Sequence, residues 1–347
     1  MLSRYIFFAV FLLFIVFMLA LDLGVFHKKD HVIHVKEAAL WTGIWVALAM
    51  LFAVLLHFHA EWIHGIGNLD ELQEYAQRNG LGAQIQGLDY PEALKIYRHE
   101  VTSQYLAGYF LEEALSMDNI FVMIMIFVSF GIERKYYHRV LFWGVLGAIV
   151  MRFVFIFTLG ALVGRFSWVL AIFGAILIYS GFKMFFDKGD ERIDTANHPV
   201  VRFASRHFRV SRTGDGHNFF TKIDGKNYIT PLFLVLLIIE FSDVIFAVDS
   251  IPAVFSVTTD TYIVFFSNIF AIMGLRSLFF LMSDVADRFW LLKYGLGVLL
   301  CFIGVKMIVH EFLHVEVSTA VSLLTILGIL IGSVVLSILI PKRKNVA

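Results

Sequence analysis

The chain has 347 residues, of which 59% are hydrophobic and 16% charged, and its formal net charge is zero. Soluble domains carry roughly 25% charged residues, so this deficit, with apolar runs along the whole chain, indicates a polytopic membrane protein. Zero net charge gives no bulk attraction to nucleic acid, so we expect no nucleic-acid partner. The single cysteine, Cys301, excludes an intramolecular disulfide and argues against thiol redox chemistry.

Nine stretches are long and apolar enough to cross a bilayer as helices. They cover residues 5–26, 38–58, 104–130, 139–163, 168–186, 230–256, 262–282, 288–309 and 319–340. The first has Arg4 before an apolar core but no small-x-small cleavage site, so we expect a retained helix rather than a signal peptide. The sequence therefore predicts an all-α protein with about nine transmembrane helices in contact with membrane lipid.

The loops between these helices differ in their content of Lys and Arg. When they alternate between the two sides of the membrane, eighteen basic residues fall on one side and five on the other. Cytoplasmic loops carry the excess of basic residues in membrane proteins. We therefore expect a multi-pass protein of the inner (plasma) membrane, with its N-terminus outside and its C-terminus in the cytoplasm.

The predicted helices divide the chain into six segments. Residues 1–58 hold two N-terminal helices, 59–103 an extracytoplasmic loop, 187–229 a basic cytoplasmic loop, and 310–347 a C-terminal helix with a basic tail. The outer loop has an amphipathic pattern near Leu69–Arg78, and in the cytoplasmic loop Arg202, Arg206 and Arg209 are predicted to share a helical face. A basic face beside a membrane is typical of contact with anionic lipid, and we assign no catalysis to either loop.

The remaining two segments, 104–186 and 230–309, are similar to each other. Three matches keep a near-constant spacing: Asp118-Asn-Ile-Phe with Asp243-Val-Ile-Phe, Arg152 with Arg276, and Gly181-Phe-Lys-Met with Gly304-Val-Lys-Met. Each unit has three predicted spans, so the second unit enters the membrane from the opposite side. Such inverted repeats are typical of secondary transporters, whose substrate site lies where the units meet. The alternative is a duplicated scaffold without transport.

Residues 239–252 place three carboxylates, Glu240, Asp243 and Asp249, inside one apolar span. A carboxylate near the bilayer centre costs about 3 kcal/mol even on the most permissive insertion scales. Three in one span imply compensation by protons, water, basic side chains or a bound cation. Buried salt bridges alone are the simpler alternative.

Two further carboxylates, Glu112 and Asp118, lie in the first unit. Because a helix rises about 1.5 Å per residue, the inverted repeat predicts that Asp118 faces Asp243 and that Glu112 shares the depth of Asp249. Helical phase turns Asp249 away from the other acids of its helix. We expect Pro252 to bend or unwind the helix and so bring these carboxylates together.

Hydroxyl and amide oxygens accompany the five carboxylates. The additional candidate ligands are Ser116, Asn119, Ser242 and Ser250. Carboxylate, carbonyl and hydroxyl oxygens suit Mg²⁺, Ca²⁺ or Mn²⁺ rather than copper or zinc. Arg152 and Arg276 are the expected counter-charges, which hold the acids while no cation is bound, and a structural tie to backbone carbonyls is the equal alternative. The sequence predicts a divalent-cation site and no prosthetic group.

A literal HExxH pattern occurs at His310-Glu-Phe-Leu-His314. In zinc proteases two His one turn apart bind the metal and the Glu activates water. Here no acidic third ligand is obvious nearby, and three fixed positions arise readily by chance in a chain with 13 His. We therefore expect no enzyme activity and no catalytic residues, with an intramembrane metalloprotease as a minor alternative.

Four motifs carry a family resemblance. They are residues 112–119 (EEALSMDN), 141–152 (LFWGVLGAIVMR), 239–252 (IEFSDVIFAVDSIP) and 265–276 (FFSNIFAIMGLR). From about Leu21 to Met307 the chain resembles the TerC family of tellurium-resistance-associated integral membrane proteins, which includes Alx-like members and stands in the lysine-exporter superfamily. The main departure is the segment at about 59–100, which is longer than the short connection expected there.

The resemblance implies a membrane fold of nine or a similar number of helices and, for several members, manganese export. The acidic positions of the family fall on Glu112, Asp118, Glu240, Asp243 and Asp249. We therefore expect a secondary transporter that exports Mn²⁺ by alternating access, with protons as a candidate counter-ion. The alternative is a membrane partner protein that delivers metal to, or assists, secreted proteins or the envelope stress response. The sequence contains no reductant or thiol site that would explain tellurite resistance.

Overall fold

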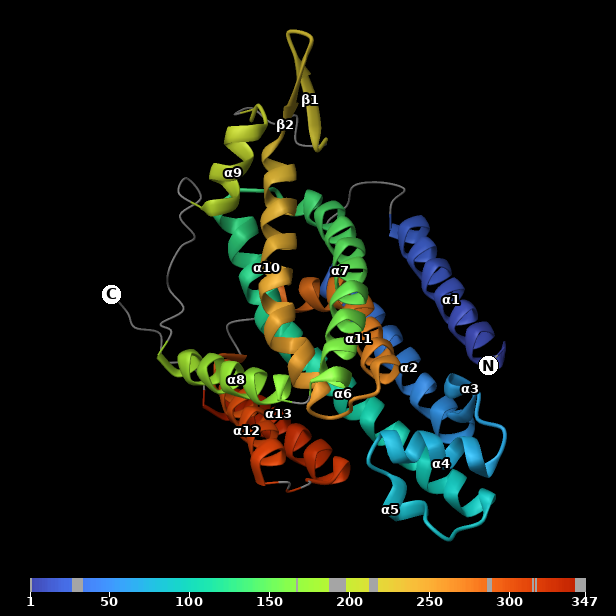
Figure 1. Ribbon diagram of the computed structural model, residues 1–347. Coiled ribbons are helices and arrows are strands. Elements are labelled where there is room, and N and C mark those ends of the chain that lie inside the picture. Colours follow the sequence, from blue (N-terminus) through green and yellow to red (C-terminus); the bar gives the residue numbers. More distant parts are fainter. Residues whose placement is uncertain are drawn as a thin grey trace.

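The computed structural model describes residues 2–26, 34–166, 168–186, 198–211, 218–285, 289–313, 315 and 317–340 (Figure 1). The predicted basic tail, His314 and much of the 187–229 loop lie outside the described residues. The described helices are α1 Leu2–Phe26, α2 Val35–His59, α3 Glu61–His64, α4 Leu69–Arg78, α5 Gly82–Ile85, α6 Tyr90–Ser129, α7 Tyr137–Arg165, α8 Val169–Phe186, α9 Pro199–His207, α10 Pro231–Phe255, α11 Thr261–Val285, α12 Leu292–Leu313 and α13 Thr319–Leu339. The predicted all-α membrane class is confirmed.

Each predicted span overlaps one of the long helices, although the ends of the spans and of the helices differ in most cases. Within the described chain, seven helices are long and apolar enough to cross a membrane: α2, α7 (counted from Arg134, with the short 3₁₀ turn before it), α8, α10, α11, α12 and α13. The apolar part of α1, Tyr5–Leu21, is shorter. Helix α6 has three acidic residues within its apolar half, Glu112, Glu113 and Asp118, which is unusual for a membrane helix.

Helix α6 is 40 residues long and begins well before the predicted span. Asp89 caps it by accepting a hydrogen bond from the Glu92 N–H (3.0 Å), and Pro91 stands in its first turn. Its first turns are polar outside, but Tyr97 and Val101 are fully buried. The loop predicted for residues 59–103 is therefore shorter than expected, because its last residues form an amphipathic extension of α6.

Helix α11 forms the centre of the molecule. Its residues 263–280 are all buried, and the helix contacts α2, α6 and α7. Phenylalanine rings fill the space between α1, α2 and α11; for example, the Phe11 and Phe266 centroids lie 4.5 Å apart at 66°. Edge-to-face pairs of this kind contribute beyond their buried area. Because α11 is buried among these helices, its packing sets the positions of the helices that carry the polar side chains described below.

Helices α8 and α12 pack closely along their glycines. A Cβ atom added at Gly174 would lie 2.8 Å from the Gly304 carbonyl oxygen, and one added at Gly181 would lie 2.6 Å from that of Gly297. Larger residues would push the two backbones apart. In Figure 1, α8, α12 and α13 form a group that runs across the direction of α10.

Residues 60–89 form a compact unit of short helices, here termed the loop module. Its amphipathic helix α4 has the predicted bounds, Leu69–Arg78, with Asn68 as its cap. His64 Nε2 lies 2.8 Å from Asp260 Oδ2, in the α10–α11 loop, and the Tyr75 hydroxyl donates to the same oxygen at 2.7 Å. Burial alone would raise the pKa of Asp260, but His64 and the hydrogen bonds that the carboxylate accepts lower it to about 2.

The described part of the 187–229 loop contains α9 and a two-stranded hairpin, β1 Phe220–Ile223 and β2 Lys226–Ile229. Asp224 and Gly225 both have positive φ angles (50° and 72°), which is the backbone of a type I′ turn. An Asp-Gly pair is the strongest local signal for such a hairpin, and the sequence interpretation missed it. In Figure 1 the hairpin extends beyond the end of α10, opposite the loop module.

The expected helical face of three arginines is only partly present. Arg202 and Arg206 are exposed on α9, but that helix ends at His207. Arg209 lies beyond its end, where its carbonyl accepts a hydrogen bond from the Ile229 N–H (2.9 Å). The prediction was wrong for Arg209 because the segment leaves the helix to run beside β2.

Candidate functional site

A buried ion pair joins the first two helices of the first unit. Arg152 of α7 donates from Nη1 to Glu112 Oε1 of α6, and the same Nη1 donates to Asn268 Oδ1 of α11 at 2.7 Å. The side chains of Arg152 and Glu112 are 3% and 0% exposed. Removing Arg152 would leave the charge of Glu112 buried without compensation, which typically costs about 3–5 kcal/mol.

Asp243 of α10 completes this arrangement. Its Oδ1 accepts a hydrogen bond from Asn119 Nδ2 of α6 at 2.9 Å and lies 3.9 Å from Arg152 Nη2. Four helices, α6, α7, α10 and α11, thus meet through Glu112, Asn119, Arg152, Asp243 and Asn268. We refer to these five residues as the acid–arginine network. It contains two carboxylates and one guanidinium group.

Several buried atoms of the network have no hydrogen-bond partner in the protein. Three are oxygen acceptors: Glu112 Oε2, Asn119 Oδ1 and Asp243 Oδ2. A buried acceptor without a partner costs about 1–3 kcal/mol, and more when it is charged. The network therefore has unused oxygen ligands, which a proton, a water molecule or a cation would satisfy.

A small cavity adjoins the network. Its lining includes Asp243, Arg276, Met123 and Gly144, and its volume is about 10 Å³. This is close to the smallest volume that holds one water molecule. The predicted counter-charge Arg276 is buried here, facing the same cavity as Asp243. An ion would need to lose most of its water shell, or the helices would need to move, before it could enter.

Helical phase explains which predicted acids meet. At about 100° per residue, Asn119 lies within about 20° of Glu112 on α6, whereas Asp118 is turned by about 240°. Accordingly Asn119, not Asp118, contacts Asp243, and Asp118 is half-buried on another side. The predicted pairing of Asp118 with Asp243 through the repeat is replaced by an Asn–Asp contact.

Asp249 points away from the network. Its Oδ1 accepts a hydrogen bond from Ser180 Oγ of α8 at 3.1 Å. The expected unwinding at Pro252 is wrong, because α10 is helical without a break from Pro231 to Phe255. Asp249 therefore keeps the phase of a regular helix, about 240° from Asp243.

Glu240 contacts α7 at a glycine. The side chain is half-buried, and a Cβ atom built on Gly147 would collide with its carboxylate. Of the remaining candidates, Ser116 donates to Glu112 Oε1 at 3.4 Å, Ser250 is buried with an unpartnered hydroxyl, and Ser242 is half-buried. Among the described residues, no three His, Cys, Asp or Glu side chains converge as a metal-ion site.

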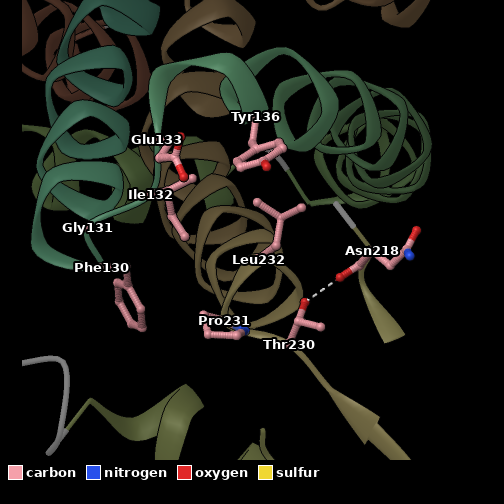
Figure 2. A pocket seen from close by; sticks show the side chains of 9 residues that line it. All are labelled: Phe130, Gly131, Ile132, Glu133, Tyr136, Asn218, Thr230, Pro231 and Leu232. Carbon is pink, nitrogen blue, oxygen red and sulfur yellow. Dashed lines mark hydrogen bonds between the residues drawn. The ribbon is translucent and has the colours of Figure 1, made fainter. Parts of the chain in front are cut away.

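A second cavity lies at the hairpin end of the molecule and is separate from the network. Figure 2 shows its lining, which joins the end of α6 (Phe130–Glu133) to the start of α10 (Thr230–Leu232). Its volume is about 190 Å³, and the Thr230 hydroxyl donates to the Asn218 carbonyl beside it at 2.7 Å. These contacts cap α10 and attach the hairpin, so they explain local structure without a ligand.

The family comparison agrees with the motifs that form the network. A model of the "Integral membrane protein TerC family" matches residues 97–345, which include all five residues of the network. The chain belongs to the TerC family. No solved structure shows a significant match.

Relatives of this TerC-family protein match almost its full length. A protein of Escherichia coli K12 named "Putative membrane-bound redox modulator Alx" is 40% identical over 94% of this chain and 92% of its own. An uncharacterized membrane protein of Myxococcus xanthus is 40% identical over 95% and 91%, and one of Rickettsia bellii is 34% identical over 95% of both chains. Each match leaves fewer residues of this chain unaligned than the loop module contains. The segment at about 59–100, which was expected to differ from the family, is therefore at least partly shared by these relatives.

Sequence reasoning missed one member of the network, Asn268. It lies in the FFSNIF motif that carried the resemblance, and it is a fully buried amide within an apolar helix. Its Nδ2 donates to the Val264 carbonyl at 3.0 Å, which leaves Oδ1 for Arg152. A polar side chain within an apolar membrane helix was the available signal.

Proposed function

We propose that this TerC-family protein is a secondary transporter that exports divalent cations, with Mn²⁺ as the main substrate. The observation that supports this most is the set of three buried oxygens, Glu112 Oε2, Asn119 Oδ1 and Asp243 Oδ2, that have no partner. Oxygen ligands of this kind suit hard divalent cations. Glu240, Asp249 and Asp118, on other faces of α6 and α10, would serve as successive carboxylates along the path.

Arg152 would act as an internal competitor for the cation. It contacts Glu112 and lies 3.9 Å from Asp243, so it neutralises part of the network while no cation is bound. A cation bound by the two carboxylates would displace the guanidinium, and the return of Arg152 would favour release. Protons are the proposed counter-ion, because closely spaced carboxylates in a low dielectric take up protons readily.

Packing between the units 104–186 and 230–309 supports alternating access. At the repeat offset of 123, Gly174 corresponds to Gly297 and Gly181 to Gly304. Gly174 packs against Gly304 and Gly181 against Gly297, so the contact is reciprocal. Likewise α6 contacts α11, and α10 contacts α7. A two-fold axis between inverted repeats produces such reciprocal pairs, and the two units could rock about it.

The direct test is metal flux by purified protein in liposomes. We expect Mn²⁺ to be transported faster than Mg²⁺, Ca²⁺ or Zn²⁺, and an imposed pH gradient to change the rate. Cells that normally carry this protein in their inner membrane should accumulate manganese, and become sensitive to it, when the protein is removed. Absence of flux for all four ions would contradict the proposal, and a rate that ignores the pH gradient would remove only proton coupling.

A second candidate is a membrane partner protein that assists secreted proteins or delivers metal to them. The loop module favours it, because a folded unit held by the buried His64–Asp260 contact offers a docking surface beside the membrane. The relatives' name, redox modulator, suggests a related role, but the Cys301 thiol is half-buried and faces the Ile178 carbonyl of α8 (3.8 Å). Co-purification with translocation components, without manganese flux in liposomes, would support this candidate.

A further inference from the structure

A third cavity lies away from the acid–arginine network. Its volume is about 400 Å³, and it opens where the loop module, α6, the α10–α11 loop and the ends of α12 and α13 come together. Residues from Arg78 to Thr319 thus share one hollow. None of the residues of the network lines it.

Two opposite charges line this cavity without forming an ion pair with each other. Lys306 Nζ of α12 donates to Ser322 Oγ of α13 at 2.9 Å. Glu100 Oε1 of α6 accepts from Gln104 Nε2 at 3.1 Å and from the Thr319 hydroxyl. Both charged side chains are half-buried and line the same hollow, so each is held in place by neutral partners. A ligand that carries both signs of charge would complement them.

The rest of the lining is polar on one side and apolar on another. Thr258 donates to Gln104 Oε1 at 2.6 Å, which fixes the amide that supports Glu100. Arg78 of the loop module adds a second cation at the rim, where its one ion pair is with Glu74 (2.5 Å). Leu170, Phe255 and Met307 form an apolar wall at the ends of membrane helices.

We propose that this cavity binds an ethanolamine phosphodiester, the headgroup of a zwitterionic phospholipid. The phosphodiester would lie against Lys306 and Arg78, and the ammonium group against Glu100. The apolar wall would accept the glycerol end, where acyl chains leave the headgroup. A divalent cation fits the hollow poorly, because Glu100 is the one carboxylate among the described residues of the lining and Lys306 is half-buried in the same lining.

Such a ligand would contact three parts of the chain at once. It would touch the loop module through Arg78, α6 through Glu100 and α12 through Lys306. Lipid binding would therefore stabilise the loop module against the two units. This inference does not depend on which ion, if any, the network transports.

The test uses the full chain in non-ionic detergent and titration calorimetry with two soluble diesters. Glycerophosphoethanolamine should bind about tenfold more tightly than glycerophosphoglycerol, because a half-buried charge-assisted contact is worth about 1.4 kcal/mol. Glu100→Gln should remove this preference but keep the binding of glycerophosphoglycerol, which also shows that the variant is folded. Lys306→Gln should weaken both ligands about tenfold, and the matched exposed variant Lys95→Gln should change neither.

Equal affinity of the wild type for the two diesters, no binding of either, or a preference retained by Glu100→Gln would overturn the proposal. Nanodiscs then distinguish lipid from a free diester. The wild type should melt at a higher temperature in phosphatidylethanolamine than in phosphatidylglycerol, and Glu100→Gln should not. If the melting temperature were equal in the two lipids while the free diester still bound, the cavity would be assigned to a soluble diester. That result would overturn its assignment to lipid.

Discussion

Two buried acids in this protein have opposite surroundings. Both oxygens of Asp260 are satisfied: Oδ2 meets Tyr75 and His64, while Oδ1 accepts from the backbone N–H of Tyr262 at 2.9 Å. Asp243 has Asn119 and a distant contact with Arg152 on Oδ1, and its Oδ2 has no partner. Burial is similar for the two, with 7% and 3% of the residue exposed.

The difference distinguishes a carboxylate that holds the fold together, here called an anchor, from one that belongs to a binding site. A fully satisfied buried carboxylate stabilises one arrangement of the chain and has no ligand position left. An incompletely satisfied one costs free energy in the folded protein, and a bound partner recovers that cost. We therefore assign stability to Asp260 and substrate binding to Asp243, and the following three substitutions test this assignment.

Asp243→Asn should have the largest effect. Loss of one charged ligand is worth about 1.5–3 kcal/mol, so we expect manganese flux in proteoliposomes to fall about 100-fold while the melting temperature changes little. Asp249→Asn is the matched control, because Asp249 is hydrogen-bonded to Ser180 outside the network, and its flux should fall less than about tenfold. Wild-type flux in Asp243→Asn would show that the network does not bind the ion.

Asp260→Asn should act on stability rather than on transport. The pKa of Asp260 is lowered from 3.8 to about 2, so ionisation contributes about 2–3 kcal/mol to the folded state at neutral pH. Because the folded pKa is below the unfolded one, this contribution is complete above about pH 4 and is lost as pH falls towards 2.

Limited proteolysis of the loop module provides the measurement for this variant. Asp260→Asn should expose the segment 60–89 to cleavage at pH 7, and the difference from wild type should disappear near pH 2–3, with an acid-stable protease as the probe. The exposed variant Asp70→Asn should behave as wild type. A changed apparent affinity for manganese in Asp260→Asn, with the module intact, would break the distinction between anchor and site.

Gly147→Ala should have the smallest effect of the three. Its Cβ would collide with the Glu240 carboxylate, which is the far end of a flexible side chain and must then move. We expect manganese flux to fall several-fold, since Glu240 belongs to the proposed path. Gly164→Ala, also on α7, is the control, because its Cβ would meet nothing within 4 Å. Equal flux in both variants would place Glu240 outside the path.

Much of the network was accessible from helical periodicity. Glu112, Ser116 and Asn119 are spaced i, i+4 and i+7, so any regular helix places them on one face. Arg152 was predicted as a counter-charge from its place in an apolar span. Two predictions differ from the structure. Repeat alignment placed Asp118 opposite Asp243, and Pro252 was expected to change the direction in which Asp249 points.

The sequence by itself determined the membrane class, the long helices, the bounds of α4 and the acids that cannot lie in lipid without compensation. Hydropathy and helical phase are local properties, so they can be read along one chain. Only the tertiary structure decided which partner each acid meets. The rotation of α6, α7, α10 and α11 about their axes follows from side-chain packing around the buried α11, and it directs Asn119 to Asp243 and Asp249 to Ser180. The same packing brings His64 to Asp260 across most of the chain, a contact that no local pattern predicts.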